Sequence, residues 1–133
     1  MATLAIKKIT EEGVTTTALT TCTSGGDDFI NSGVEFLRFQ NDHATQQYTV
    51  TVTPGSTKFK HPRYGKITKA AISQSVSAGN TIYFGPFKPN AWNDTANKIA
   101  ITYIAGTSGS TAISTISSGD HKLKCEVLYL DPL

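Results

Sequence analysis

The sequence is poor in charge, in cysteine and in long apolar runs. Only 17% of its 133 residues are charged, and 12 Lys and Arg against 10 Asp and Glu leave a net charge of +2. This balance excludes a protein that binds nucleic acid through bulk charge, and a hydrophobic content of 38% excludes a disordered tail. No window approaches the roughly 18 apolar residues of a membrane-spanning helix, and MATLAIKKIT does not resemble a secretory signal. We therefore expect one domain, residues 1–133, with no membrane partner.

Metal and disulfide patterns are equally scarce. Cys22 and Cys125 lie far apart and form no CxxC pair, so two small buried side chains are favoured over one bridge. The histidines are scattered, and structural zinc needs four ligands where only one pair, His121 and Cys125, has suitable spacing. GGDD at 25–28 lacks the alternating ligands of a calcium loop and is expected to be a solvated turn. The sequence predicts no metal and no cofactor.

Catalytic motifs are missing as well. GTSGS at 106–110 lacks the spacing of a GxSxG elbow, and the chain has no Walker-type or dinucleotide-binding loop. No set of residues offers a nucleophile, a base and oxyanion donors together. We therefore expect a protein that is not an enzyme and has no catalytic residues.

Threonine and serine, in contrast, are abundant, with 20 and 11 residues. Most lie in runs that alternate with Val, Ile, Tyr or Phe, as at 48–52, and runs at 99–103 and 123–129 have the same two-residue period. Residues 66–78 also admit a helical spacing, but their Ser, Thr and β-branched content favours a strand. Because turn signals separate these runs at near-regular intervals, the pattern predicts an all-β sandwich or barrel.

Aromatic residues supply the expected core. Residues 34–39 are apolar on both faces of a strand, which indicates a central position in a sheet, and we expect Phe36 and Tyr48 to point inward. Phe87 and Trp92 are expected to close one end of the fold where the chain crosses between sheets. If these two rings were exposed instead, they would form a sugar or peptide platform with Tyr83.

Charge is distributed unevenly along the chain. The stretch between Asp42 and Asp94 contains no acidic residue and six basic ones, Lys58, Lys60, Arg63, Lys66, Lys69 and Lys88. Such a segment could be a solvated loop, a positive face for an acidic protein, or a binder of single-stranded nucleic acid through its interleaved aromatic rings. The low overall charge places protein contact ahead of nucleic acid.

Two stretches carry a family resemblance. GGDDFINSGVEFLRFQN at 25–41, followed by TVTVTP, and SAGNTIYFGPFKPNAWND at 77–94, followed by KIAITYI, resemble the head decoration (cement) proteins of tailed bacteriophages over residues 4–105. The resemblance implies a jelly-roll-like antiparallel β-sandwich without catalysis. It also implies an oligomer, a trimer in preference to a dimer, that is made in the host cytoplasm and binds the major capsid protein on the exterior of the virion.

The expected capsid interface is the basic segment, at Lys58, Lys60, Arg63 and Lys66, together with an N-terminal arm. We expect this arm, residues 1–9 with Leu4 and Ile6, to pair along a strand edge of its own fold or of a neighbour. The alternative function is a glycan-binding or adhesive module of a phage tail or fibre that uses Tyr83, Phe87 and Trp92.

Overall fold

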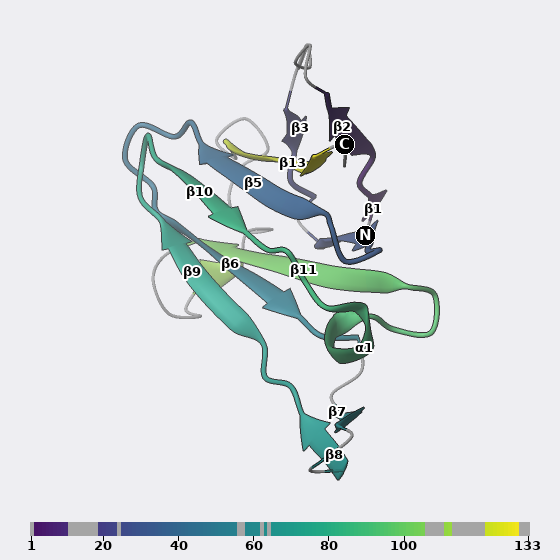
Figure 1. Ribbon diagram of the computed structural model, residues 1–133. Coiled ribbons are helices and arrows are strands. Elements are labelled where there is room, and N and C mark those ends of the chain that lie inside the picture. Colours follow the sequence, from purple (N-terminus) through teal and green to yellow (C-terminus); the bar gives the residue numbers. More distant parts are fainter. Residues whose placement is uncertain are drawn as a thin grey trace.

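The structure is a computed structural model that describes residues 2–10, 19–23, 25–55, 58–61, 63, 65–105, 111–112 and 122–130. Two sheets pack face to face (Figure 1). The first has the order β1 (Ala2–Thr3), β4 (Asp27–Ile30), β11 (Lys98–Ala105), β6 (Tyr48–Thr53) and β9 (Ile72–Val76), with β12 (Thr111–Ala112) paired to β11. The second has the order β10 (Thr81–Phe84), β5 (Phe36–Asn41), β13 (Leu123–Leu130) and β2 (Ile6–Ile9), with β3 (Thr20–Thr21) also paired to β13. The chain is an all-β sandwich, as its alternating runs predict.

The strand order is that of a jelly roll. When β3, β4, β5, β6, β9, β10, β11 and β13 are numbered one to eight, the first sheet reads 2-7-4-5 and the second 1-8-3-6, and every neighbouring pair is antiparallel. Two insertions interrupt this core. The hairpin of β7 (Lys58–His61) and β8 (Gly65–Thr68) follows the fourth strand, and helix α1 (Pro89–Trp92) follows the sixth. Both insertions lie at the same end of the sandwich (Figure 1).

The N-terminal segment closes one side of the sandwich. β1 pairs in parallel with β4, and β2 pairs in parallel with β13 beyond the point where β3 ends. Leu4 lies between them, is 6% exposed, and donates its N–H to the carbonyl of Asp28 at 2.8 Å. Ile6 packs against the same core. Of the two arrangements expected for the arm, the structure has pairing along strand edges of its own fold, and Leu4 and Ile6 contact the core of their own chain.

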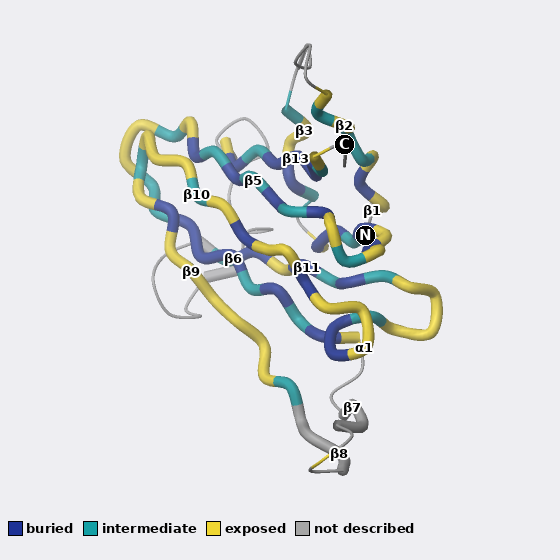
Figure 2. The backbone as a smooth tube through the Cα atoms, in the orientation of Figure 1, coloured by how far each residue is buried: buried dark blue, intermediate teal, exposed yellow. Residues whose placement is uncertain are grey.

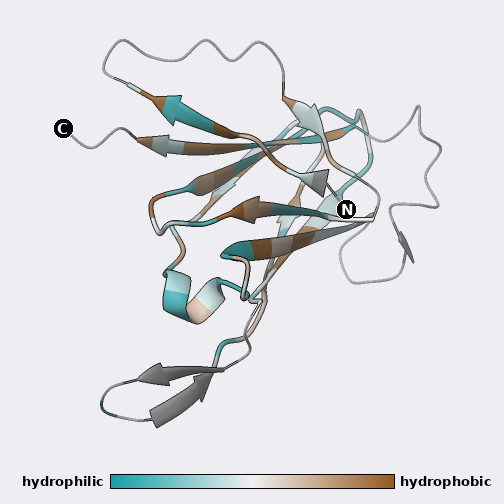
Figure 3. Cartoon of the chain, turned by 90° about the vertical axis from the view of Figure 1, so that its right-hand side faces the viewer, coloured by the Kyte–Doolittle hydropathy of each residue, from teal (hydrophilic) through white to brown (hydrophobic). Residues whose placement is uncertain are grey.

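A two-residue period selects the core side chains. In β5, buried Leu37, Phe39 and Asn41 alternate with half-buried Phe36, Arg38 and Gln40. Figure 2 shows buried positions along the inner strands and long exposed stretches on the edge strands β9 and β10. In the side view of Figure 3, hydrophobic residues recur along the strands of both layers, and α1 lies at one end of them. Tyr48 is fully buried, and residues 66–78 form β8 and β9.

Phe36 does not point into the core, contrary to expectation. It lies on the outer face of the second sheet, where its ring centroid is 6.4 Å from that of Tyr83. The register explains the difference, because Leu37 pairs with Val127 and Phe39 with Cys125, and these four side chains are fully buried. Since residues 34–39 are apolar in both phases, the phase is decided by the neighbouring strand.

This placement predicts unequal effects of two truncations in β5. Leu37→Ala removes a fully buried side chain, so we expect it to lower the free energy of unfolding by about 2–5 kcal/mol. Phe36→Ala removes a half-buried ring, for which we expect about 1 kcal/mol. Urea denaturation of both variants measures the difference, and a larger loss for Phe36→Ala would contradict the register.

Candidate functional site

Part of the basic segment forms a hairpin that is separate from both sheets. Its strands β7 and β8 pair with each other, Lys58 with Thr68 and Lys60 with Lys66, as a two-stranded sheet. Figure 1 shows this pair beyond α1, at the tip of the molecule. For these two strands the structure describes the backbone, so the side chains of Lys58, Lys60 and Lys66 lie outside the described set. Arg63, between the strands, is exposed. We call β7, Arg63 and β8 the basic hairpin.

The chain on either side of the basic hairpin is fixed to α1. Before β7, Gly55 donates its N–H to the carbonyl of Trp92 at 2.8 Å. A Cβ at Gly55 would lie 2.5 Å from the backbone nitrogen of Asp94, so only glycine fits this approach. After β8, the Lys69 ammonium lies 4.9 Å from the centroid of the Trp92 ring, a cation–π contact. Both connections therefore hold the hairpin to one structural element.

The rings of Phe87 and Trp92 pack together and attach α1 to the core. Phe87 and Trp92 are 3% and 6% exposed, and their rings meet edge to face with centroids 5.0 Å apart. The ring of Phe87 also reaches Phe29, at 6.0 Å. Tyr83, in contrast, is 63% exposed. The three rings named for a sugar platform are therefore divided, two in the core and one on the surface.

The loop between β4 and β5 ties the same end together. The Asn31 side-chain amide donates to the carbonyl of Phe87 at 3.0 Å and to Oδ1 of Asn93 at 2.7 Å, and Asn93 donates back to the Asn31 carbonyl at 2.8 Å. The Glu35 carboxylate accepts hydrogen bonds from the backbone and hydroxyl of Ser32. Burial acts to raise the pKa of Glu35, but these hydrogen bonds outweigh it and hold that pKa below its ordinary value of 4.5.

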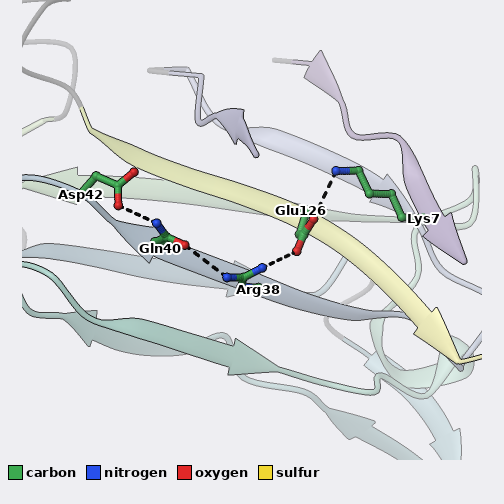
Figure 4. A network of polar contacts seen from close by, with 5 residues as sticks. All are labelled: Lys7, Arg38, Gln40, Asp42 and Glu126. Carbon is green, nitrogen blue, oxygen red and sulfur yellow. Dashed lines mark hydrogen bonds and ion pairs between the residues drawn. The ribbon is translucent and has the colours of Figure 1, made fainter. Parts of the chain in front are cut away.

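A chain of polar contacts crosses the outer face of the second sheet (Figure 4). Glu126 accepts from Lys7 at 3.2 Å and from Arg38 at 2.9 Å, and its side chain is only 2% exposed. Arg38 also donates to Gln40 at 3.2 Å, and Gln40 donates to Asp42 at 2.6 Å. Three strands, β2, β13 and β5, thus contribute to one network. We call these five residues the sheet-face network.

Exposed apolar residues lie on the same side of the second sheet as this network. Tyr83 occupies the position paired with Arg38, and Phe36 the position paired with buried Leu128. Tyr83 and Leu130 are each 63% exposed. The sequence alone did not identify Arg38 and Glu126 as partners. The available signal was an acid, Glu126, on the polar face of the run at 123–130 and a base, Arg38, in the apolar run at 34–39.

Of the histidines, His43 has a structural role. His43 uses Nδ1 to accept the backbone N–H groups of Thr45 and Gln46, at 3.1 and 2.8 Å, which closes a turn. In the part of the chain that the structure describes, no helix is both long and apolar enough to cross a bilayer.

We predict that the sheet-face network depends on its buried acid. Glu126→Gln keeps the shape but leaves Arg38 and Lys7 without their shared counter-charge, so we expect the free energy of unfolding to fall by about 3 kcal/mol. The control is Asp42→Asn at the exposed end of the network, for which we expect less than about 1 kcal/mol. If urea denaturation showed the same loss of unfolding free energy in both variants, the buried acid would contribute no more than an exposed ion pair does.

The lowered pKa of Glu35 predicts that the stability of the fold depends on pH. Because its pKa is lower in the folded than in the unfolded chain, its contribution to stability is complete above pH 4.5 and is lost as the pH falls through the folded pKa. The stability difference between wild type and Glu35→Gln should therefore shrink in acid, as measured by urea denaturation from neutral pH to below 4.5. If the stability difference between wild type and Glu35→Gln did not change with pH, the hydrogen bonds to the ionised Glu35 carboxylate would not be the cause of its effect.

Comparison with known proteins adds no relative. No family model matches the chain, and no curated protein or solved structure is significantly similar to it.

Proposed function

We propose that this protein is a virion structural protein that binds the outer surface of a bacteriophage capsid and stabilises the lattice of the major capsid protein. The observation that carries the proposal is the basic hairpin. It is paired with itself, stands apart from both sheets, and holds four of the six basic residues of an acid-free stretch. A fixed body with a projecting, positively charged arm is suited to binding an acidic protein surface.

The register of the basic hairpin supports an external counter-charge. Lys60 and Lys66 occupy directly paired positions, an arrangement that weakens a strand pair when both residues are charged. A two-stranded sheet is also marginal by itself in water. An acidic surface on a capsid subunit would relieve the repulsion and add contacts, so the hairpin gains stability where it binds.

The outer face of the second sheet supports oligomerisation. Tyr83 and Leu130 leave apolar area exposed beside the sheet-face network. We propose that copies of the chain associate through this face, as a trimer in preference to a dimer. Each copy then presents one basic hairpin, and several weak contacts with the exterior of the capsid combine into tight binding because later contacts are intramolecular.

The alternative, a glycan-binding module of a tail or fibre, has less support. Its platform requires exposed neighbouring rings, whereas Phe87 and Trp92 are buried and Tyr83 alone is exposed. Loss of glycan binding on Tyr83→Ala, with capsid binding absent, would favour this alternative over the capsid.

Charge reversal tests the proposal. We expect Lys58→Glu/Lys66→Glu to weaken binding to capsids that lack this protein by an order of magnitude or more, measured by co-sedimentation. The charge-matched control is Lys8→Glu/Lys122→Glu, which changes two exposed lysines outside the hairpin. Both variants should fold, since the control changes two exposed charges and the hairpin pairs outside both sheets of the sandwich.

Wild-type binding should also weaken as salt shortens the screening length below ~10 Å. If neither the hairpin variant nor salt between about 0.05 and 0.5 M changed the binding, the proposal that the basic hairpin binds through its charge would be contradicted. Equal weakening by the control variant would show that net charge matters and the hairpin does not.

A further inference from the structure

A cluster of metal-ligating side chains is buried between the two sheets. Cys22 follows β3, and Cys125 lies in β13, so both belong to the second sheet, while Asp27 begins β4 of the first sheet. Their exposed fractions are 2%, 0% and 0%. One ligand atom from each, two sulfurs and a carboxylate oxygen, lie within 4.8 Å of one another. Neither cysteine is in a disulfide.

The two oxygens of Asp27 are in different environments. Oδ2 accepts the backbone N–H of Thr23 at 3.0 Å and the hydroxyl of Tyr103 at 2.8 Å. Oδ1 is fully buried and has no hydrogen-bond partner. A buried carboxylate oxygen without a partner is costly, and native proteins rarely retain one without a compensating group. One oxygen is therefore fixed in place by donors while the other is left for a ligand that the protein does not supply.

We propose that Cys22, Asp27 and Cys125 bind one zinc ion. Thiolate ligands exclude calcium and magnesium, which prefer oxygen, and a mixed set of two sulfurs and one carboxylate suits the borderline-soft Zn²⁺. For three atoms within 4.8 Å of one another, some point lies no more than about 2.8 Å from all of them. Zn–S and Zn–O bonds of about 2.3 and 2.1 Å then require shifts of at most about 0.5 and 0.7 Å.

Tyr103 acts as a positioning residue for this ion. Its hydroxyl orients the Asp27 carboxylate, as outer hydrogen bonds commonly orient metal ligands. Burial raises the pKa of the Tyr103 hydroxyl, so it remains a donor. Three protein ligands leave one position of a tetrahedron for a water molecule.

Binding releases two thiol protons to solvent as the ion brings two positive charges, so the net charge of the cluster stays the same. Burial and the neighbouring Cys125 thiol raise the pKa of Cys22 above its ordinary value. The ion replaces these protons and joins β4 of one sheet to β13 of the other. Because such a site does not exist in the unfolded chain, its binding free energy adds to the stability of the fold. This inference is independent of the proposed capsid binding.

Metal content and stability test the zinc site directly. The whole chain is unfolded in chelator and reductant, refolded with or without zinc, dialysed, and measured for zinc per chain and melting temperature. We expect one zinc per chain and a higher melting temperature in the zinc sample. Co²⁺ in place of zinc should give the charge-transfer absorption of thiolate ligands. No bound metal, an unchanged melting temperature, or a Cys22–Cys125 disulfide in the native protein would overturn the proposal.

Four variants separate ligation from general destabilisation. Asp27→Asn keeps the side-chain shape, and Cys125→Ser is close to it, so both should fold but lose stoichiometric metal. Tyr103→Phe retains all three ligands and should weaken metal affinity about 10- to 100-fold. Val50→Ala, a core truncation in β6, should lower the melting temperature yet retain one zinc. Full metal binding by Asp27→Asn and Cys125→Ser, or equal metal loss in Val50→Ala, would refute this ligand set.

Discussion

The pairing of β5 with β13 is the constraint on which the rest of the structure depends. Its register turns Leu37, Phe39 and Cys125 inward, and turns Arg38 and Glu126 outward. A slip of one residue in either strand would reverse the faces of that strand and bury Arg38 or Glu126 in place of apolar side chains. The sheet-face network, the core and the buried cysteine of the zinc cluster therefore all follow from one alignment of two central strands.

The two surfaces with proposed roles lie in different parts of the sandwich, one at an end and one on the outer face of the second sheet. At one end, hydrogen bonds of Asn31 and Asn93 and the packing of Trp92 make a firm base for the basic hairpin. The outer face of the second sheet presents a different chemistry, with an ion-pair chain beside exposed Tyr83 and Leu130. The basic hairpin, proposed to bind the capsid, and the sheet face proposed for oligomerisation can thus change independently, because they share no side chain.

The sequence predicted the strands well because a two-residue period is local information. It failed at Phe36, where both phases of the strand are apolar and only the pairing with Val127 and Cys125 decides between them. It failed again at the GGDD turn, expected to be solvated, because Asp27 is fully buried beneath Tyr103.

The candidate sites were predictable to different degrees. The basic hairpin could be predicted because its basic residues lie close together in the sequence, within a run that contains no acid. The zinc cluster was invisible, because residues 22, 27 and 125 come from both sheets and only tertiary packing brings them together. The partners Arg38 and Glu126 were missed for the same reason, being 88 positions apart.

The position of β13 in the second sheet limits the order in which the chain can fold. This strand pairs with β2, β3 and β5, so the second sheet cannot assemble until residues 123–130 have left the ribosome. The first sheet has its central pairs complete once β11 has been made. Pairing across such long sequence separations is slow. Before β13 pairs, the second sheet cannot fully cover the apolar inner face of the first sheet, and exposed apolar surface of this kind makes incompletely folded chains prone to aggregation.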